Sequence, residues 1–230
     1  MSAYSIAETM ETIQGEGHWS GTPALFLRFA GCNMWSGVAE DRERDAARHE
    51  ASCPKFCDTD FTPRFKMTAD EIVGQVSAYA KKGGTLMVVT GGEPLLQLDA
   101  ELLSRLITLV RVSVETNGTI RLSPRLSAIW DRTRRFWVTC SPKQAPAHLK
   151  LDPSRIDELK VVYPDYDPET YRVWCGPQAR LYIQPVAQIE SAVVGRSLMH
   201  QPALEAAAAW CMAHPTWGLS LQTHKLLGIP

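Results

Sequence analysis

The sequence lacks long apolar runs and has almost no net charge. No stretch approaches the roughly 20 apolar residues that span a bilayer, and the first residues lack the charged-then-apolar pattern of a secretory signal. The formal net charge is −1, so no global field would attract nucleic acid or an anionic membrane. These absences predict a cytoplasmic protein that works without a membrane or nucleic-acid partner.

Cysteine is also scarce, with six residues in a chain of 230, which excludes a small disulfide scaffold. A reducing cytosol keeps thiols free, so clustered cysteines there indicate a metal or redox site. Cys32, Cys53 and Cys57 lie together in one segment. Cys140, Cys175 and Cys211 are scattered among apolar neighbours, which is typical of plain buried thiols. The first three cysteines are therefore the candidate ligands.

The apolar fraction of 45% suits a single globular domain over residues 1–230. Short apolar runs predict strands at 24–30, 85–89, 111–115, 135–139, 159–163, 181–183 and 219–221. Capping residues and periodicity predict helices at 68–82, 99–109, 123–130, 168–174 and 203–213. This alternation indicates an α/β fold with a parallel sheet. Because a full eight-unit barrel typically needs about 250 residues, we expect an incomplete, partial TIM-like β/α barrel of about six units.

Chemically distinctive segments follow successive predicted strands. They are Gly91-Gly-Glu-Pro94, Glu115-Thr-Asn-Gly118, Ser141-Pro-Lys143, Gln184-Pro185 and Gln222-Thr-His-Lys225. In a barrel, positions just after the strands fall on one face, where active sites are built. Strand-ending turns explain the glycines, prolines and asparagines, but not the recurrence of Glu, Lys, Gln and His. Together the segments predict a pocket.

The cysteine spacing, Cys32-x20-Cys53-x3-Cys57, is compatible with two metals. A cubane iron–sulfur cluster is normally held by four cysteines, so three would leave one iron open to a small chelating ligand. Zinc is the alternative, because His49 with the three cysteines would complete a Cys3His site. Spacing alone leaves both open.

Gly31-Cys-Asn-Met-Trp35 and Phe56-Cys-Asp-Thr-Asp60 resemble the cluster loop of radical S-adenosylmethionine (SAM) enzymes. With Ile13-Gln-Gly-Glu-Gly17, the segments above and Gly228-Ile-Pro230, the chain resembles the 7-carboxy-7-deazaguanine synthase family from residue 4 onward. The resemblance implies a 4Fe-4S cluster on Cys32, Cys53 and Cys57. Their spacing is wider than the family's usual C-x3-C-x2-C. The insert at 36–52 is rich in charge and alanine and is expected to form a small exposed helix.

The resemblance also implies ligands for SAM, magnesium and a pterin substrate. SAM would be bound by Gly91, Gly92, Glu93, Ser141, Lys143 and Gln184, and Mg²⁺ by Thr59. The substrate would be bound by Gln14, Glu16, Arg28, Thr90, Glu115, Asn117, His224 and Pro230, the last at the end of a tail, 222–230, that closes the site. Apart from the resemblance, Arg28 lies in the middle of a predicted strand, where a buried arginine requires an anionic partner. Glu16 and Glu115 are the candidates for this ion pair.

The implied reaction is the ring contraction of 6-carboxy-5,6,7,8-tetrahydropterin to 7-carboxy-7-deazaguanine, with loss of ammonia, in queuosine biosynthesis. The cluster and SAM carry that chemistry, so no protein acid or base is assigned. A flavodoxin-type electron donor and a homodimer are implied in the same way. The alternatives are another radical SAM enzyme, such as a glycyl-radical activase, and a zinc-stabilised scaffold with no enzymatic activity.

Overall fold

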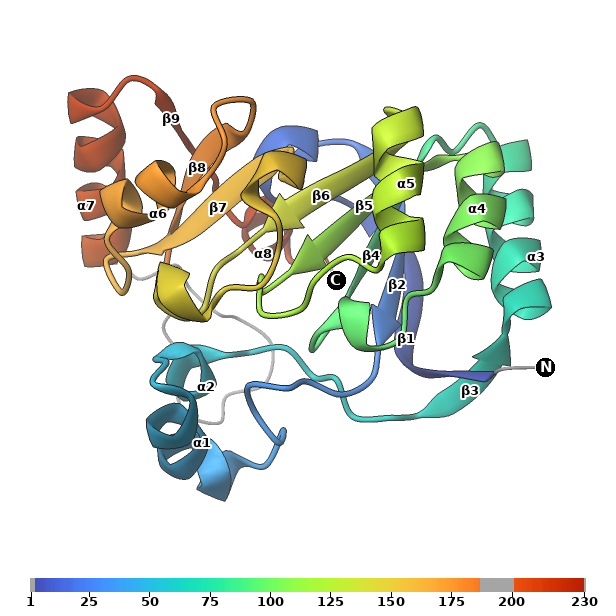
Figure 1. Cartoon of the computed structure of the whole chain (residues 1–230), viewed down its shortest axis with the longest axis horizontal. Helices are drawn as coiled ribbons and strands as arrows, with labels where there is room; N and C mark the ends of the chain where they lie inside the picture. Colours follow the sequence, from blue (N-terminus) through green and yellow to red (C-terminus); the bar gives the residue numbers. More distant parts are fainter. Residues whose placement is uncertain (1–2, 187–200, 230) are drawn as a thin grey trace.

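The computed structural model describes residues 3–186 and 201–229. Within them lies one sheet of nine strands in the order β3-β1-β2-β4-β5-β6-β7-β8-β9 (Figure 1). The strands are β1 (Ala3–Ile13), β2 (Pro23–Phe29), β3 (Phe65–Thr68), β4 (Leu86–Gly91), β5 (Arg111–Thr116), β6 (Phe136–Cys140), β7 (Glu158–Tyr163), β8 (Arg180–Pro185) and β9 (Trp217–Leu219). Neighbours from β2 to β9 are parallel, whereas β1 is antiparallel to β2 and β3. The sheet does not close into a full barrel, which confirms the predicted incomplete β/α barrel.

Helices follow most of the parallel strands. They are α3 (Ala69–Lys81), α4 (Ala100–Leu109), α5 (Pro124–Arg132), α6 (Pro168–Trp174) and α7 (Gln201–Ala213), with the shorter α1 (Arg42–His49), α2 (Cys53–Phe56) and α8 (Thr223–Leu227). The predicted capping box forms at the start of α3, where the Thr68 side chain accepts from Glu71 N–H and the Glu71 carboxylate accepts from Thr68 N–H. None of the helices in the described ranges is long and apolar enough to cross a bilayer.

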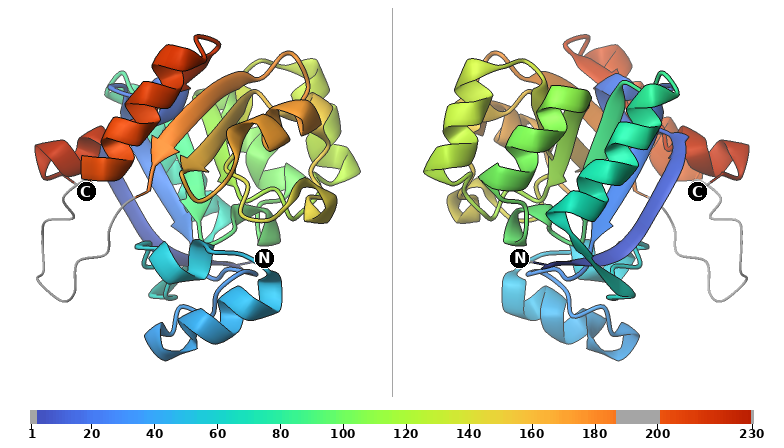
Figure 2. Two further views of the ribbon diagram at one scale, coloured as in Figure 1. Left: turned by 90° about the vertical axis from the view of Figure 1, so that its left-hand side faces the viewer. Right: turned by 90° about the vertical axis from the view of Figure 1, so that its right-hand side faces the viewer.

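The main core lies between the sheet and these helices, which flank it in Figures 1 and 2. In β7, Leu159 and Val161 are fully buried in this core. Side chains alternate between the two faces of a strand, so Glu158 and Lys160 lie on the opposite, inner face. The helix-covered face must be apolar. Polar residues at every second position of a strand therefore line the inside of the barrel.

The strands β1 and β3, at one edge of the sheet, are not among those predicted from the sequence. In β1, threonine and glutamate interrupt the short apolar pattern, and a bulge between Ile6 and Glu8 shifts its register against β2. β9 begins at Trp217, two residues before the predicted strand, and ends at Leu219. The insert contains α1, as expected, and α1 lies with α2 below the sheet in Figure 1.

Candidate active site

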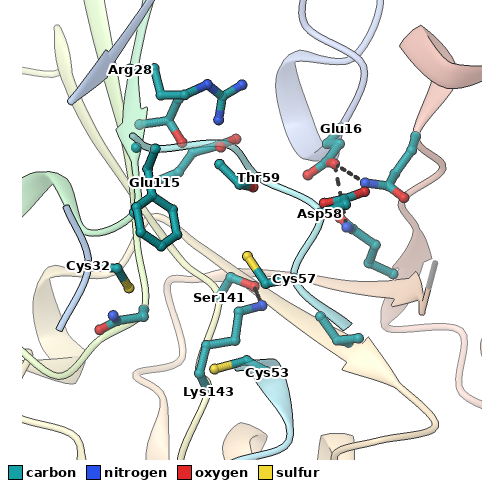
Figure 3. Close-up of a pocket in the computed structure, with 18 of the residues that line it drawn as sticks. Glu16, Arg28, Cys32, Cys53, Cys57, Asp58, Thr59, Glu115, Ser141 and Lys143 are labelled. Atoms are coloured by element: carbon teal, nitrogen blue, oxygen red, sulfur yellow. Dashed lines mark hydrogen bonds between the residues drawn. The ribbon is translucent and has the colours of Figure 1, made fainter. Parts of the chain in front are cut away.

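A cavity of about 470 Å³ opens at the carboxyl ends of the parallel strands. Every predicted site residue that the structure describes lines this cavity, with the exception of Glu93. Figure 3 shows two groups within it: the three cysteines with Ser141 and Lys143 in the lower half, and Glu16, Arg28, Thr59 and Glu115 in the upper half. Pro230 lies outside the described residues, so its role stays a prediction.

The three cysteines lie around one part of the cavity. Cys32 follows β2, while Cys53 and Cys57 lie at the two ends of α2, where Cys57 N–H donates to the Cys53 carbonyl at 2.9 Å. This single helical turn brings residues four apart to the same side. Burial raises the pKa of Cys32, and it raises the pKa of Cys53 to about 12. Burial therefore favours the protonated form of these two thiols until a bound cation compensates the charge of the thiolates, as a metal does.

The donor set fits an iron–sulfur cluster better than zinc. His49 does not line the cavity, and its carbonyl accepts from Gln144 at 2.5 Å. Across residues 3–186 and 201–229, no three His, Cys, Asp or Glu side chains are grouped tightly enough for one metal ion. A single zinc, with Zn–S bonds of about 2.3 Å, needs its thiolates within about 4 Å of one another. A cubane spreads its ligands over several irons, so it does not require the three thiolates to meet at one ion.

The insert helix braces the cysteine loop through Arg42. The guanidinium of Arg42 donates to the carbonyls of Pro54 and of Cys57, the latter at 2.9 Å. Its central carbon lies 4.0 Å from the centroid of the Trp35 ring, a cation–π contact. The insert thus supports the lengthened loop by holding its backbone at Pro54 and at Cys57.

Gly91 and Gly92 bring the end of β4 against the cysteine loop. Gly91 has a φ of 149°, and a Cβ there would lie 2.3 Å from the carbonyl oxygen of Phe29. A Cβ on Gly92 would lie 2.3 Å from the Gly31 carbonyl oxygen and 2.6 Å from the Cβ of Cys32. Both positions therefore require glycine, because backbone atoms fill the space that a side chain would occupy.

Among the described candidate site residues, Glu93 is the one that does not line the cavity. Its side chain is fully buried, and its carboxylate accepts from Leu95 N–H at 2.9 Å, Thr116 Oγ1 at 2.8 Å and Asn117 N–H at 2.8 Å. Burial raises the pKa of Glu93 to about 7, against the effect of these hydrogen bonds. The carboxylate therefore joins the glycine turn to the end of β5, and its predicted contact with SAM stays a prediction.

We expect Gly92→Ala to reduce the iron content and to raise the KM for SAM at least about tenfold. The reason is that the new methyl group would push the Gly31 backbone and Cys32 away from the end of β4. The matched control is Gly74→Ala, on the exposed face of α3, where a Cβ meets nothing within 4 Å. That variant should gain about 0.5–1 kcal/mol in free energy of unfolding, as alanine replaces glycine inside a helix. Normal iron content in Gly92→Ala would contradict the close contact.

The upper half of the cavity contains two carboxylates around a buried lysine. Lys160 Nζ forms an ion pair with Glu16 and lies 3.6 Å from Glu115 Oε1. Glu16 Oε1 accepts from Gln222 at 2.8 Å, and Glu115 Oε1 accepts from Gln14 at 3.0 Å. Burial would raise the pKa of Glu16, but Lys160 and Gln222 lower it to about 2. Glu16 is therefore a carboxylate throughout the physiological range.

Arg28 has a different partner from the two considered in the sequence. Its Nε donates to Glu8 Oε2 at 3.3 Å, so the interpretation that it pairs with Glu16 or Glu115 is wrong. Lys160 is the cation that pairs with those two glutamates, and it is not among the site residues predicted from the sequence. Its signal was the alternation of Glu158 and Lys160 with apolar residues in β7.

The lower half presents polar groups suited to SAM. Lys143 Nζ donates to Ser141 Oγ at 2.9 Å, and burial lowers the pKa of Lys143. Gln184 reaches toward the upper half, because its Nε2 is 3.4 Å from Glu16 Oε1, while its buried Oε1 has no hydrogen-bond partner among the described residues. An unpartnered buried acceptor beside a cavity is an attachment point for a ligand donor.

The helix α8 and the residue before it form one wall of the cavity. Thr223 N–H donates to the Gly15 carbonyl at 3.0 Å, and the His224 ring lies where a Cβ on Gly15 would be, 2.1 Å from Nδ1. Lys225 forms an ion pair with Asp58 in the cysteine loop, which leaves the neighbouring Thr59 facing the cavity. Burial lowers the pKa of His224. These contacts place His224 in the cavity, as predicted.

No family model matches the chain. Three curated relatives are each named 7-carboxy-7-deazaguanine synthase. That of Nitratidesulfovibrio vulgaris is 39% identical over 99% of both chains, that of Bradyrhizobium diazoefficiens 38% over 99% of both, and that of Bacteroides thetaiotaomicron 36% over 97% of both. The crystal structure of QueE from Escherichia coli has the same fold, with a TM-score of 0.60 at 19% identity, covering 95% of this chain and 93% of that one. At such identities over nearly its whole length, the chain belongs to the 7-carboxy-7-deazaguanine synthase family.

Proposed function

We propose that this chain is a radical SAM lyase that converts 6-carboxy-5,6,7,8-tetrahydropterin to 7-carboxy-7-deazaguanine with loss of ammonia. The observation that carries the proposal is that the two halves of one cavity differ chemically. Three thiols lie in one half, and an arginine with two glutamates lies in the other (Figure 3). The names of the full-length relatives give the same activity. The step belongs to queuosine and 7-deazapurine biosynthesis.

Cys32, Cys53 and Cys57 would hold a 4Fe-4S cluster, which together with SAM would supply the radical chemistry. Gly91 and Gly92 fix the end of β4 beside Cys32. Lys143, Ser141 and Gln184 would orient SAM through donors and the unpartnered Gln184 oxygen. Their role is to place the reacting atoms and to exclude water from a half-enclosed site.

The other half would bind the pterin. Glu16 and Glu115 can accept from the amino edge of its pyrimidine ring, as carboxylates accept from the cytosine amino group. Arg28 is held by Glu8 through Nε, and Figure 3 shows its guanidinium group turned into the cavity, where it suits a carboxylate. Gln14, Thr90, Asn117 and His224 line the remaining surface.

The remaining component of the proposed site is a bound Mg²⁺ ion. Thr59 offers a hydroxyl at the cavity, whereas the adjacent Asp58 is engaged by Lys225. Mg²⁺ keeps several waters and takes few protein ligands, so one hydroxyl with substrate oxygens completes a reasonable shell. The flavodoxin-type electron donor and the homodimer stay predictions.

The test is product formation by anaerobic, cluster-reconstituted protein given SAM, Mg²⁺, a reductant and the carboxypterin. We expect 7-carboxy-7-deazaguanine and ammonia in equal amounts, with a marked fall in rate when Mg²⁺ is chelated. SAM cleavage without the deazaguanine would reject the substrate and favour another radical SAM reaction. Stoichiometric zinc with no sulfide would reject the cluster.

A further inference from the structure

We propose that Lys160 is a positioning residue that holds Glu16 and Glu115 as a matched pair of anionic acceptors for the pyrimidine edge of the substrate. The inference rests on the proposed function and adds a residue to it. It is carried by the juxtaposition of one buried lysine and two carboxylates on the inner face of the sheet.

Lys160 is almost completely buried, which a lysine side chain requires an ion-pair partner to offset. The residue is 4% exposed and lies in the middle of β7, on the face opposite the main core. Lysine is almost never so buried without a partner. Its partners are Glu16, in direct contact, and Glu115, 3.6 Å away. They come from separate parts of the chain, so Lys160 joins β5, β7 and the loop after β1.

The local charges show why this cation matters. Glu158 lies one inward position before Lys160 and accepts from His18 N–H at 3.1 Å, but it does not line the cavity. Three glutamates thus surround one lysine. Without it, these like charges would repel one another, which favours uptake of a proton by one of the carboxylates. A protonated carboxyl group is a donor, which opposes the N–H donors of an aminopyrimidine.

The hydrogen bonds also indicate which oxygen remains for the substrate. Lys160 contacts Glu16 Oε2, and Gln222 and Gln184 contact Glu16 Oε1. Gln14 donates to Glu115 Oε1. Within residues 3–186 and 201–229 no hydrogen bond is made to Glu115 Oε2. We therefore assign this oxygen as the first acceptor for the exocyclic amine, with its orientation set by Gln14 and Lys160.

The experiment compares Lys160→Met with Lys160→Arg, and with Lys150→Met as the exposed control. The measurements are KM for the carboxypterin, KM for SAM, and the Kd of oxidised 6-carboxypterin with and without its 2-amino group. For Lys160→Met we expect KM for the carboxypterin and Kd for 6-carboxypterin to rise about 10- to 100-fold, the worth of one or two charge-assisted hydrogen bonds. KM for SAM and SAM cleavage without substrate should stay within about twofold.

Two further results separate positioning from mere support of the fold. The analogue without the amino group should bind wild type and Lys160→Met within about threefold of each other, because the affected contact is already missing. Lys160→Arg, which keeps the cation, should restore part of the affinity.

An unchanged carboxypterin KM in Lys160→Met would overturn the assignment and leave the proposed function standing. Equal losses for SAM and pterin would show a structural role and would also overturn it. Wild-type protein that cleaves SAM but binds no 6-carboxypterin would overturn both proposals.

Discussion

Cys57→Ser is expected to abolish product formation, with a fall in rate of at least about 10⁴-fold. Loss of one of three ligands leaves a cluster without secure attachment, and an enzyme whose cofactor performs the chemistry loses its rate enhancement with it. Cys57 has no substitute nearby, because no other described cysteine lines the cavity apart from Cys32 and Cys53. The measurements are iron and acid-labile sulfide per chain together with the rate of deazaguanine formation.

The matched control for this variant is Cys211→Ser. Cys211 lies on α7 and packs against the main core, away from the cavity. It should keep the iron, the sulfide and the activity, with a loss of about 1 kcal/mol in free energy of unfolding for a partly buried thiol. Cys57→Ser protein that retains full iron and sulfide would contradict the assignment of the three ligands.

Glu115→Gln is expected to raise the KM for the carboxypterin about 100- to 1000-fold. The amide is nearly isosteric, but it replaces one acceptor oxygen by an NH₂ group and removes the negative charge that faces Lys160. A site that hydrogen-bonds the polar groups of its substrate loses much of its affinity when one of these hydrogen bonds cannot form. The reason is that the polar group opposite is left buried and unpaired. KM and kcat should be measured separately for the pterin and for SAM.

Glu101→Gln, at an exposed position of α4, controls for general effects of the substitution and should leave both constants unchanged. The SAM constants of Glu115→Gln should also stay near those of wild type, since Ser141 and Lys143 lie in the other half of the cavity (Figure 3). A wild-type KM for the pterin in Glu115→Gln would remove Glu115 from the substrate site.

Features of the fold that depend on neighbouring residues in the chain could be predicted from the sequence. The apolar runs gave the strands of the parallel sheet, and Thr68, Asp99 and Ser123 marked helix starts that the structure confirms. The segments after successive strands meet in one cavity because parallel strands share an edge for their carboxyl ends. Motif recognition thus gave the lining residues, although it could not give their hydrogen bonds.

What the sequence could not give depends on pairings between distant segments. Arg28 contacts Glu8 because β1 lies antiparallel to β2, and β1 itself has no clear strand pattern. Glu93 belongs to a recognisable motif, yet the hydrogen bonds that bury it come from β5 and the loop after it. Lys160 has no motif, and only its position on the inner face reveals its partners.

The docking of α8 has a consequence for the order in which the molecule is made. Its contacts reach back 208 residues from Thr223 to Gly15 and 167 residues from Lys225 to Asp58. Synthesis proceeds from the N-terminus, so α8 is among the last elements to be made. A nascent chain that has emerged only as far as β8 already carries the three cysteines but lacks this wall. Residues 222–227 therefore enclose the site only after almost the whole chain has been synthesised.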